Sequence, residues 1–151
     1  MTTRVHRRLR APRARVYRAL TERDEIVQWK FPGGMSCEVH EFDPSGFRIS
    51  LTYGAPDRVG KTNAHTDTYR GRFTELVPGE RVVEIDEFES DDPATRGEMI
   101  ITVTLSDADG GTDLVAVHEG LPAGVSEVDN ETGWREALAR LAALVERTEP
   151  R

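Results

Sequence analysis

The sequence contains a single cysteine, Cys37, in 151 residues. One thiol excludes an internal disulfide, and no cluster of thiols and imidazoles has the spacing of a metal site. We therefore expect neither a structural metal nor a cofactor.

Long hydrophobic runs are also missing. No apolar stretch approaches the roughly 20 residues that a membrane-spanning helix needs, and the N-terminal segment MTTRVHRRLRAPRARV lacks the apolar core of a signal peptide. A hydrophobic fraction of 37% and a charged fraction of 31% are typical of a soluble globular protein. We expect a cytoplasmic protein that does not associate with membranes.

Positive charge is scarcer than negative charge, and the net charge is -7. This argues against general nucleic-acid binding, which depends on neutralising phosphates. Arginines crowd residues 4–18, whereas carboxylates crowd residues 80–92. We interpret these regions as solvated faces, or as two regions lying near each other, in preference to a polyanion site.

Recognisable catalytic signatures are absent as well. The chain has no GxSxG, no HExxH, no phosphate-cradling glycine loop and no cysteine in a reactive signature. Any enzymatic activity would therefore depend on isolated ionisable residues.

Hydrophobic periodicity shows what is present. The length suits one domain, residues 1–151. Period-two alternation predicts strands at residues 3–10, 35–42, 47–53, 66–76, 81–88, 98–105 and 112–119. Helical spacing predicts two short helices after the first strand, beginning near Pro12 and Thr21. A long C-terminal helix carries an apolar stripe of Trp134, Leu138, Leu141, Ala142 and Val145.

Turn signals between the strands predict an antiparallel sheet. The clearest are Asp43-Pro-Ser-Gly46 and the Asp-Gly-Gly at residues 109–111. One long helix can cover only one face of such a sheet, so we expect the sheet to bend around the helix.

The stretch VQWKFPGG, residues 27–34, places Trp29 and Phe31 on either side of Lys30, directly before a Pro-Gly-Gly break. Large aromatic side chains are costly to leave in water. Both aromatics either line one end of an internal cavity or plug the core without meeting a ligand, and the sequence leaves these alternatives open.

Several motifs together resemble a known superfamily. They are APRARVYRALTERDEIVQW, Phe42-Asp43 with Gly46-Phe47, YRGRFTELVPGERVV, Gly110-Gly111-Thr112, His118-Glu119-Gly120, and Gly133-Trp134 with Leu138 and Leu141. Their order and spacing resemble the START-like superfamily, also called SRPBCC, and most closely its branch named for homology to the activator of the heat-shock-protein-90 ATPase. The resemblance implies an α+β helix-grip fold, in which a curved antiparallel sheet wraps the C-terminal helix around an apolar cavity.

The expected cavity nominates ligand-binding residues. They are Trp29, Phe31, Phe47, Ile49, Leu51, Tyr53, Tyr69, Met99, Trp134 and Leu138. Met99 has a flexible thioether that suits irregular ligands, although filling core gaps is the commoner use of methionine.

The ionisable residues on predicted strands are the candidates for chemistry. They are His118, His40, Arg48 and Asp86. A histidine titrating near neutrality acts as an acid or base on a bound carbonyl compound in cyclases and hydratases that resemble this fold. Simple alternation slightly favours the opposite view, with His118 facing outward and Val115 and Val117 facing inward.

The leading hypothesis is a protein that binds a small hydrophobic ligand in this cavity. The alternative is an enzyme of polyketide cyclase or hydratase type that uses His118 or Asp86 in the same cavity. Such an enzyme needs an ionisable pair within hydrogen-bond reach inside the cavity, and a carrier does not. A chaperone ATPase activator ranks third, because the eukaryotic activators carry an additional N-terminal domain. We expect no nucleic-acid or membrane partner and keep a homodimer open.

Overall fold

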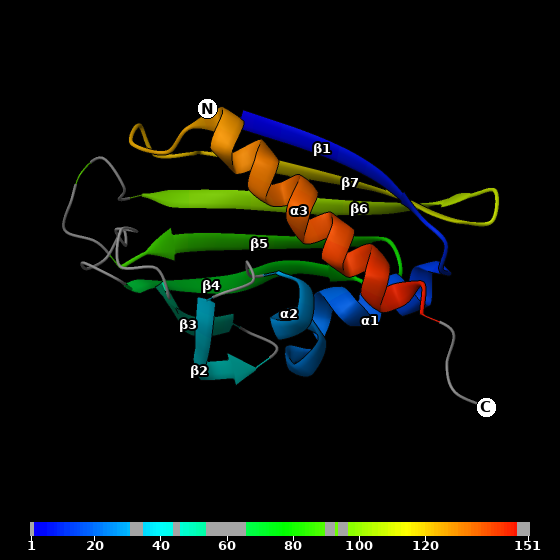
Figure 1. The fold of residues 1–151 in the computed structure, drawn as a ribbon, viewed down its shortest axis with the longest axis horizontal. Coiled ribbons are helices and arrows are strands. Elements are labelled where there is room, and N and C mark those ends of the chain that lie inside the picture. Colours follow the sequence, from blue (N-terminus) through cyan, green and yellow to red (C-terminus); the bar gives the residue numbers. More distant parts are fainter. Residues whose placement is uncertain are drawn as a thin grey trace.

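The structure, a computed structural model, describes residues 2–30, 35–43, 46–53, 66–89, 93 and 97–147, excluding the side chains of residues 35–37, 51–53, 66 and 67. Within these residues the chain forms one seven-stranded antiparallel sheet with three helices on one face (Figure 1). This is the predicted α+β helix-grip architecture.

The elements follow the predicted order. They are β1 (Thr2–Leu9), α1 (Arg13–Thr21), α2 (Arg23–Trp29), β2 (Met35–Asp43), β3 (Gly46–Tyr53), β4 (Thr66–Val77), β5 (Arg81–Phe88), β6 (Glu98–Ala108), β7 (Gly111–Glu119) and α3 (Glu127–Val145). Across the sheet the strand order is β1-β7-β6-β5-β4-β3-β2. Strands β2 to β7 therefore form a meander of sequential neighbours, and β1 closes it by pairing with β7, with Thr2 opposite Glu119.

The core lies between the sheet and the helices. Alternate residues of β6 and β7 face this side, because side chains of a strand point to opposite faces in turn. The largest fully buried aliphatic side chains come from the sheet and the helices: Leu9, Val16, Ile49, Leu114, Leu138 and Leu141. In Figure 1, α3 crosses this face diagonally, with α1 and α2 near its C-terminal end.

The apolar stripe predicted for the long helix is confirmed. Four of its five residues are buried, and Trp134 is half-buried against the same core. The helix begins after Ser126, whose hydroxyl accepts a hydrogen bond from the backbone N–H of Asp129 at 3.2 Å. Such an N-cap satisfies one of the free N–H groups of the first turn.

Two element boundaries differ from the prediction. Thr21 does not open the second helix; it ends α1, and its hydroxyl donates to the carbonyl oxygen of Tyr17 at 2.9 Å. Serine and threonine hydroxyls make this backward bond when they lie inside a helix. Strand β6 extends to Ala108 because the turn needs only two residues, with Gly110 at a φ of 77°.

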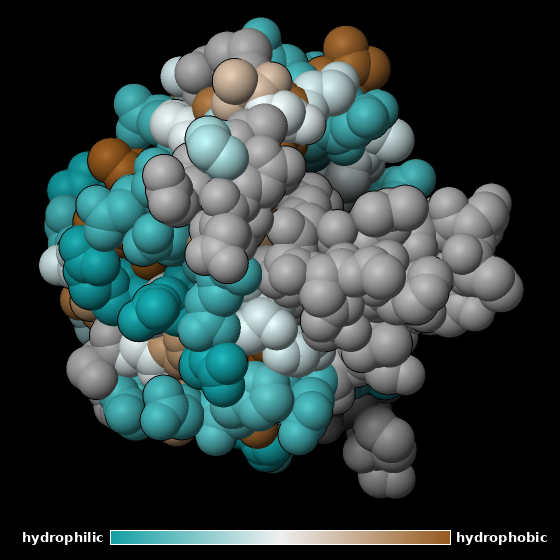
Figure 2. Space-filling model, turned by 90° about the vertical axis from the view of Figure 1, so that its left-hand side faces the viewer, coloured by the Kyte–Doolittle hydropathy of each residue, from teal (hydrophilic) through white to brown (hydrophobic). Residues whose placement is uncertain are grey.

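The end of the molecule shown in Figure 2 is mostly hydrophilic where its residues are coloured, and its hydrophobic side chains are scattered. In the described part of the chain, no helix has the length and apolar character needed to cross a membrane.

Candidate functional site

Polar side chains interrupt the apolar, helix-facing side of the sheet. The strand register places Thr3, His118, Ile101, Glu84 and Phe73 in one row across β1, β7, β6, β5 and β4. The next row contains Met99, Asp86, Gly71, Phe47 and Phe42. Together with Lys30 at the end of α2, the buried residues Glu84, Asp86 and His118 form what we call the interior polar cluster.

Lys30 and Glu84 make a buried ion pair. The Nζ atom of Lys30 donates to both carboxylate oxygens of Glu84, at 2.8 and 3.1 Å, and lies 5.2 Å from the ring centroid of Phe47. Burial alone lowers the pKa of Lys30, but the charges of Glu84 and Asp86 and the hydrogen bond to Glu84 outweigh it and raise the pKa overall. Lys30 therefore stays charged inside the protein.

Asp86 lies two residues after Glu84 on the same face of β5 and is 3% exposed. Burial raises the pKa of Asp86 well above its ordinary value, and the negative charge of Glu84 adds to this effect, whereas Lys30 opposes it. A hydrogen bond with Glu84 raises the pKa further. In that bond the protonated carboxyl of Asp86 donates to the Glu84 carboxylate, because an ionised carboxylate has no proton to donate.

A glycine makes room for the Asp86 carboxyl. A Cβ placed on Gly71 of β4 would lie 2.3 Å from Oδ1 of Asp86 and 2.4 Å from Cζ of Phe47. Any side chain at Gly71 would therefore displace both groups. The carboxyl and the edge of the Phe47 ring both occupy the space above Gly71 that a side chain would otherwise fill.

His118 faces the core, and the expectation from alternation was wrong. His118 is 7% exposed and shares its face of β7 with Thr112, Leu114 and Ala116. Valine side chains on the opposite face misled the prediction, because that face is itself only partly exposed. Apolar character alone therefore does not identify the inward side of β7.

The ring nitrogens of His118 have distinct partners. Nδ1 accepts from Nε1 of Trp134 at 3.1 Å and lies 3.3 Å from the side-chain amide nitrogen of Asn130. Asn130 in turn accepts a 2.5 Å hydrogen bond from the hydroxyl of Thr3. Because Trp134 has only a donor to offer, Nδ1 carries no proton in the neutral ring and Nε2 carries one. That proton points to the sulfur of Met99, 3.2 Å away.

Burial lowers the pKa of His118 to about 4, with Lys30 adding to the effect and Glu84 opposing it. Protonation would also place a proton on Nδ1, where Trp134 already directs its N–H. His118 is therefore neutral at physiological pH and offers a hydrogen bond from Nε2. It is a poor general base there, since efficient bases titrate near the working pH.

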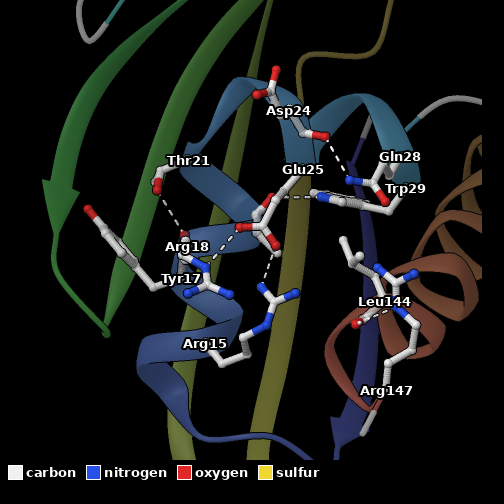
Figure 3. Close-up of polar contacts among 11 residues, drawn as sticks. Arg15, Tyr17, Arg18, Thr21, Asp24, Glu25, Gln28, Trp29, Leu144 and Arg147 are labelled. Atoms are coloured by element: carbon white, nitrogen blue, oxygen red, sulfur yellow. Dashed lines mark hydrogen bonds and ion pairs between the residues drawn. The ribbon is translucent and has the colours of Figure 1, made fainter. Parts of the chain in front are cut away.

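Trp29 connects α2 with α1 and α3 inside the core. It is 3% exposed, and its Nε1 donates to the carbonyl oxygen of Ala19 in α1 at 2.8 Å. Its own carbonyl oxygen accepts from Nε of Arg140 in α3 at 2.9 Å. Figure 3 shows Trp29 beside Leu144 of α3.

Ion pairs hold α1 and α2 together. Glu25 of α2 pairs with Arg15 and Arg18 of α1, and the contact with Arg18 measures 3.0 Å (Figure 3). The basic residues predicted to crowd the N-terminal region thus contribute in part to packing the short helices.

The other predicted ligand-binding residues divide into three groups. Phe47, Ile49 and Tyr69 are buried in a second core cluster, beyond the main one. Met99 of β6 and Leu138 of α3 are buried, and Trp134 contacts His118. The remaining predicted residues, Phe31 and the side chains of Leu51 and Tyr53, lie outside the described part of the chain.

An open groove of about 690 Å³ lies between the short helices and β2 and β4. Its lining consists of Tyr17, Thr21, Glu22, Arg23, Asp24, Phe42, Asp43, Phe73 and Leu76. Figure 3 shows Tyr17 pointing from α1 toward the green strands of the sheet, away from Trp29. The groove therefore has aromatic walls and a mainly acidic rim.

Aromatic rings connect the groove with the interior polar cluster. Phe42 and Phe73 line the groove, and their ring centroids lie 6.0 and 5.6 Å from that of Phe47. Phe47 in turn lies beside Asp86 and below Lys30. These aromatic contacts make a continuous apolar wall from the surface to the buried carboxyl.

His40 and Arg48 do not join this cluster. His40 hydrogen-bonds Ser50 at 2.7 Å, and Nε of Arg48 donates to Glu89 at 3.0 Å. Among the described residues, no group of three or more histidine, cysteine and acidic side chains is arranged to hold a metal ion.

The sequence reading missed Glu84 and Lys30. A usable signal existed, because Glu84 and Asp86 share one face of a strand whose other residues on that face, Val82 and Phe88, are apolar. Two carboxylates on a core-facing stripe indicate a buried polar site. The long side chain of Lys30 reaches Glu84 across 54 positions of sequence, and local pattern gives no indication of that contact.

Comparison with known families identifies the group. The family described as "Activator of Hsp90 ATPase homolog 1-like protein" matches residues 10–146. The chain belongs to this family. It lies within the START-like superfamily, as the sequence motifs indicated.

Solved structures share this fold, and one of them is also 37% identical in sequence. A crystal structure of a Chromobacterium violaceum protein shares 37% identity, covers 97% of this chain and 98% of its own, and has a TM-score of 0.86. A Mesorhizobium loti protein shares 21% identity over 99% and 100% of the two chains, with a TM-score of 0.75. A solution structure of an Arthrobacter aurescens protein shares 15% identity over 96% and 86%, with a TM-score of 0.78. Among proteins with curated descriptions, no relative matches this chain.

Proposed function

We propose that this protein binds a small, mostly apolar molecule between the sheet and its helices. The observation that carries the proposal is the interior polar cluster, set on a face of the sheet that is otherwise apolar. Ligand sites of this kind are mainly hydrophobic and contain a few polar groups that fix orientation. Buried polar groups without such a use cost stability.

The proposed site extends from the groove to Asp86. The aromatic wall of Phe42, Phe73 and Phe47 gives an apolar molecule a surface to follow. Met99 and Trp134 would contact the far side of the ligand through their positions beside His118. Trp29, Ile49, Tyr69 and Leu138, with the predicted Phe31, Leu51 and Tyr53, would complete the apolar lining.

Binding is tested with the purified protein and the neutral dye Nile red. We expect saturable dye fluorescence that small apolar molecules compete away, and native mass spectrometry that shows a co-purifying molecule of a few hundred daltons. Trp29→Phe separates a lining role from an anchoring role. If the tryptophan fluorescence change on binding survives this replacement unaltered, Trp29 does not contact the ligand. Absence of saturable binding by any probe would refute the function itself.

Enzymatic turnover is the second candidate, and one observation favours it. Asp86 and Glu84 are two buried carboxyl groups on the inward face of β5, and burial together with the charge of Glu84 raises the pKa of Asp86. A neutral acid beside an ionised carboxylate is an arrangement that general acid–base catalysis uses. Of the two residues named for the polyketide cyclase or hydratase hypothesis, His118 and Asp86, this arrangement favours Asp86. A molecule found bound to the protein should then be converted, and the pH–rate profile should lose a limb in Asp86→Asn.

A further inference from the structure

Oδ1 of Asp86 lacks a hydrogen-bond donor. Among the residues that the structure describes, it is the only buried side-chain nitrogen or oxygen atom without a hydrogen-bond partner. Buried polar atoms are almost always paired, because an unpaired one loses its hydrogen bonds to water without replacement. An unpaired acceptor retained in a core therefore points to a partner from outside the chain.

The hydrogen bonds of the neighbouring polar groups go to atoms other than Oδ1. The ammonium of Lys30 donates to both oxygens of Glu84. The acid proton of Asp86 is directed to the same carboxylate. On the other side are the edge of the Phe47 ring and Gly71, which has no side chain. Oδ1 is thus an acceptor facing apolar surroundings.

The charges around Asp86 select a neutral donor. Lys30 and Glu84 already neutralise each other as an ion pair. A cationic ligand group would therefore be repelled by the Lys30 ammonium, and an anionic one by the Glu84 carboxylate. Either arrangement would bury an uncompensated charge, which is far more costly than burying a hydroxyl. The raised pKa of Asp86 agrees with this choice, because a protonated carboxyl is an acceptor without net charge.

We propose that the ligand is a small, mostly apolar molecule bearing a neutral hydroxyl group, and that this hydroxyl donates a hydrogen bond to Oδ1 of Asp86. The proposal rests on the ligand-binding function proposed above. Met99 stands directly opposite Asp86 in the strand register. Its flexible thioether can change rotamer to admit the ligand next to the carboxyl.

Matched ligands test this hydrogen bond. The affinities of 2-naphthol, 2-methoxynaphthalene and 2-naphthylmethylamine for the wild-type protein are measured by calorimetry at pH 7. Menthol and its methyl ether repeat the comparison on an alicyclic frame. We expect each hydroxyl compound to bind about tenfold or more tightly than its ether, since the ether cannot donate. The ammonium compound should bind more weakly than 2-naphthol.

Variants at Asp86 test whether the preference for hydroxyl compounds over ethers depends on Oδ1 of this residue. Asp86→Asn keeps an acceptor oxygen and directs its amide to Glu84, so the hydroxyl preference should survive. Asp86→Leu removes the acceptor, and the hydroxyl and ether compounds should then bind within about twofold of each other. Glu87→Gln, at the adjacent position of β5 on the other face, is the matched control and should retain the wild-type preference.

The outcomes separate this inference from the function on which it rests. Failure of every compound and of Nile red to bind refutes the proposed function. Binding with equal affinity for hydroxyl and ether refutes the hydroxyl assignment and leaves ligand binding intact. Tighter binding of the ammonium compound, abolished in Asp86→Asn, shows that an ionised Asp86 recognises a cation. Should Asp86→Leu not fold, the wild-type ligand pairs alone decide between these results.

Discussion

His118 combines a fixed tautomer with an environment that opposes its protonated form. One ring nitrogen accepts from Trp134, and the other meets only a thioether, which is a weak acceptor. The protonated form would lose the first contact and bury a charge close to Lys30. His118 is therefore suited to holding Trp134 in place and to donating a hydrogen bond, rather than to transferring protons near neutral pH.

The lowered pKa of His118 makes a prediction about stability. In the unfolded chain the ring takes a proton near pH 6.5, whereas in the folded protein it does so only near pH 4. Stability from this group is complete above pH 6.5 and is lost as the pH falls to about 4. Relative to His118→Asn, whose oxygen can accept from Trp134 without titrating, the wild type should lose roughly 3 kcal/mol over this interval.

Urea unfolding at several pH values measures that difference, and the NMR titration of the His118 ring checks its origin directly. A ring titration midpoint near 6.5, or parallel stability curves for the two proteins, would contradict the assignment.

At the scale of elements, the packing of β4 against β5 depends on the absence of a side chain at Gly71. Gly71→Ala would force apart the Asp86 carboxyl and the Phe47 ring, because the new methyl overlaps both. We expect a loss of about 1 to 3 kcal/mol in the free energy of unfolding, which is typical of overpacking. We also expect weaker binding of any ligand that reaches Asp86.

Gly133 provides the matched control. It lies within α3, and nothing approaches within 4 Å of a Cβ placed there. Gly133→Ala should therefore stabilise the protein by roughly 0.5 to 1 kcal/mol through helix propensity. Chemical denaturation of both variants compares the two effects, and a Gly71→Ala protein as stable as the wild type would show that the two groups can move apart easily.

The elements themselves were predictable from the sequence, whereas the polar interior was predictable only in part, through Asp86 and His118. Period-two alternation located the strands, and the spacing from Leu138 to Val145 located the buried side of α3. Alternation failed at His118 because both faces of β7 carry apolar residues. The pairing of Lys30 with Glu84 depends on how α2 meets β5, which is a property of the tertiary structure.

For the whole molecule, the strand order predicts the sequence of folding events. Neighbouring strands of the meander are also neighbours in the chain, whereas β1 must find β7 about 100 residues away. Contacts between distant segments require a long loop to close, and the loss of chain entropy precedes the stabilisation that the contacts give. We infer that the meander forms first and that β1 docks after the folding transition state.

Two equivalent truncations test this order. Leu9 of β1 and Leu105 of β6 are both buried, so either change to alanine should cost about 2 to 5 kcal/mol. In stopped-flow experiments, Leu9→Ala should mainly accelerate unfolding, and Leu105→Ala should mainly slow folding. Equal slowing of folding by both would place β1 in the transition state.

The same strand order has a consequence during synthesis on the ribosome. Strand β1 emerges first, yet its partner β7 is translated about 100 residues later. At about 5 to 20 residues per second, the nascent β1 waits roughly 5 to 20 seconds with its backbone unpaired. Val5 and Leu9 would then be exposed to other chains, but Arg4, Arg7, Arg8 and Arg10 separate and flank them. Such charges oppose aggregation through exposed strands, so we expect the arginines to keep β1 from pairing with other chains until β7 has been synthesised.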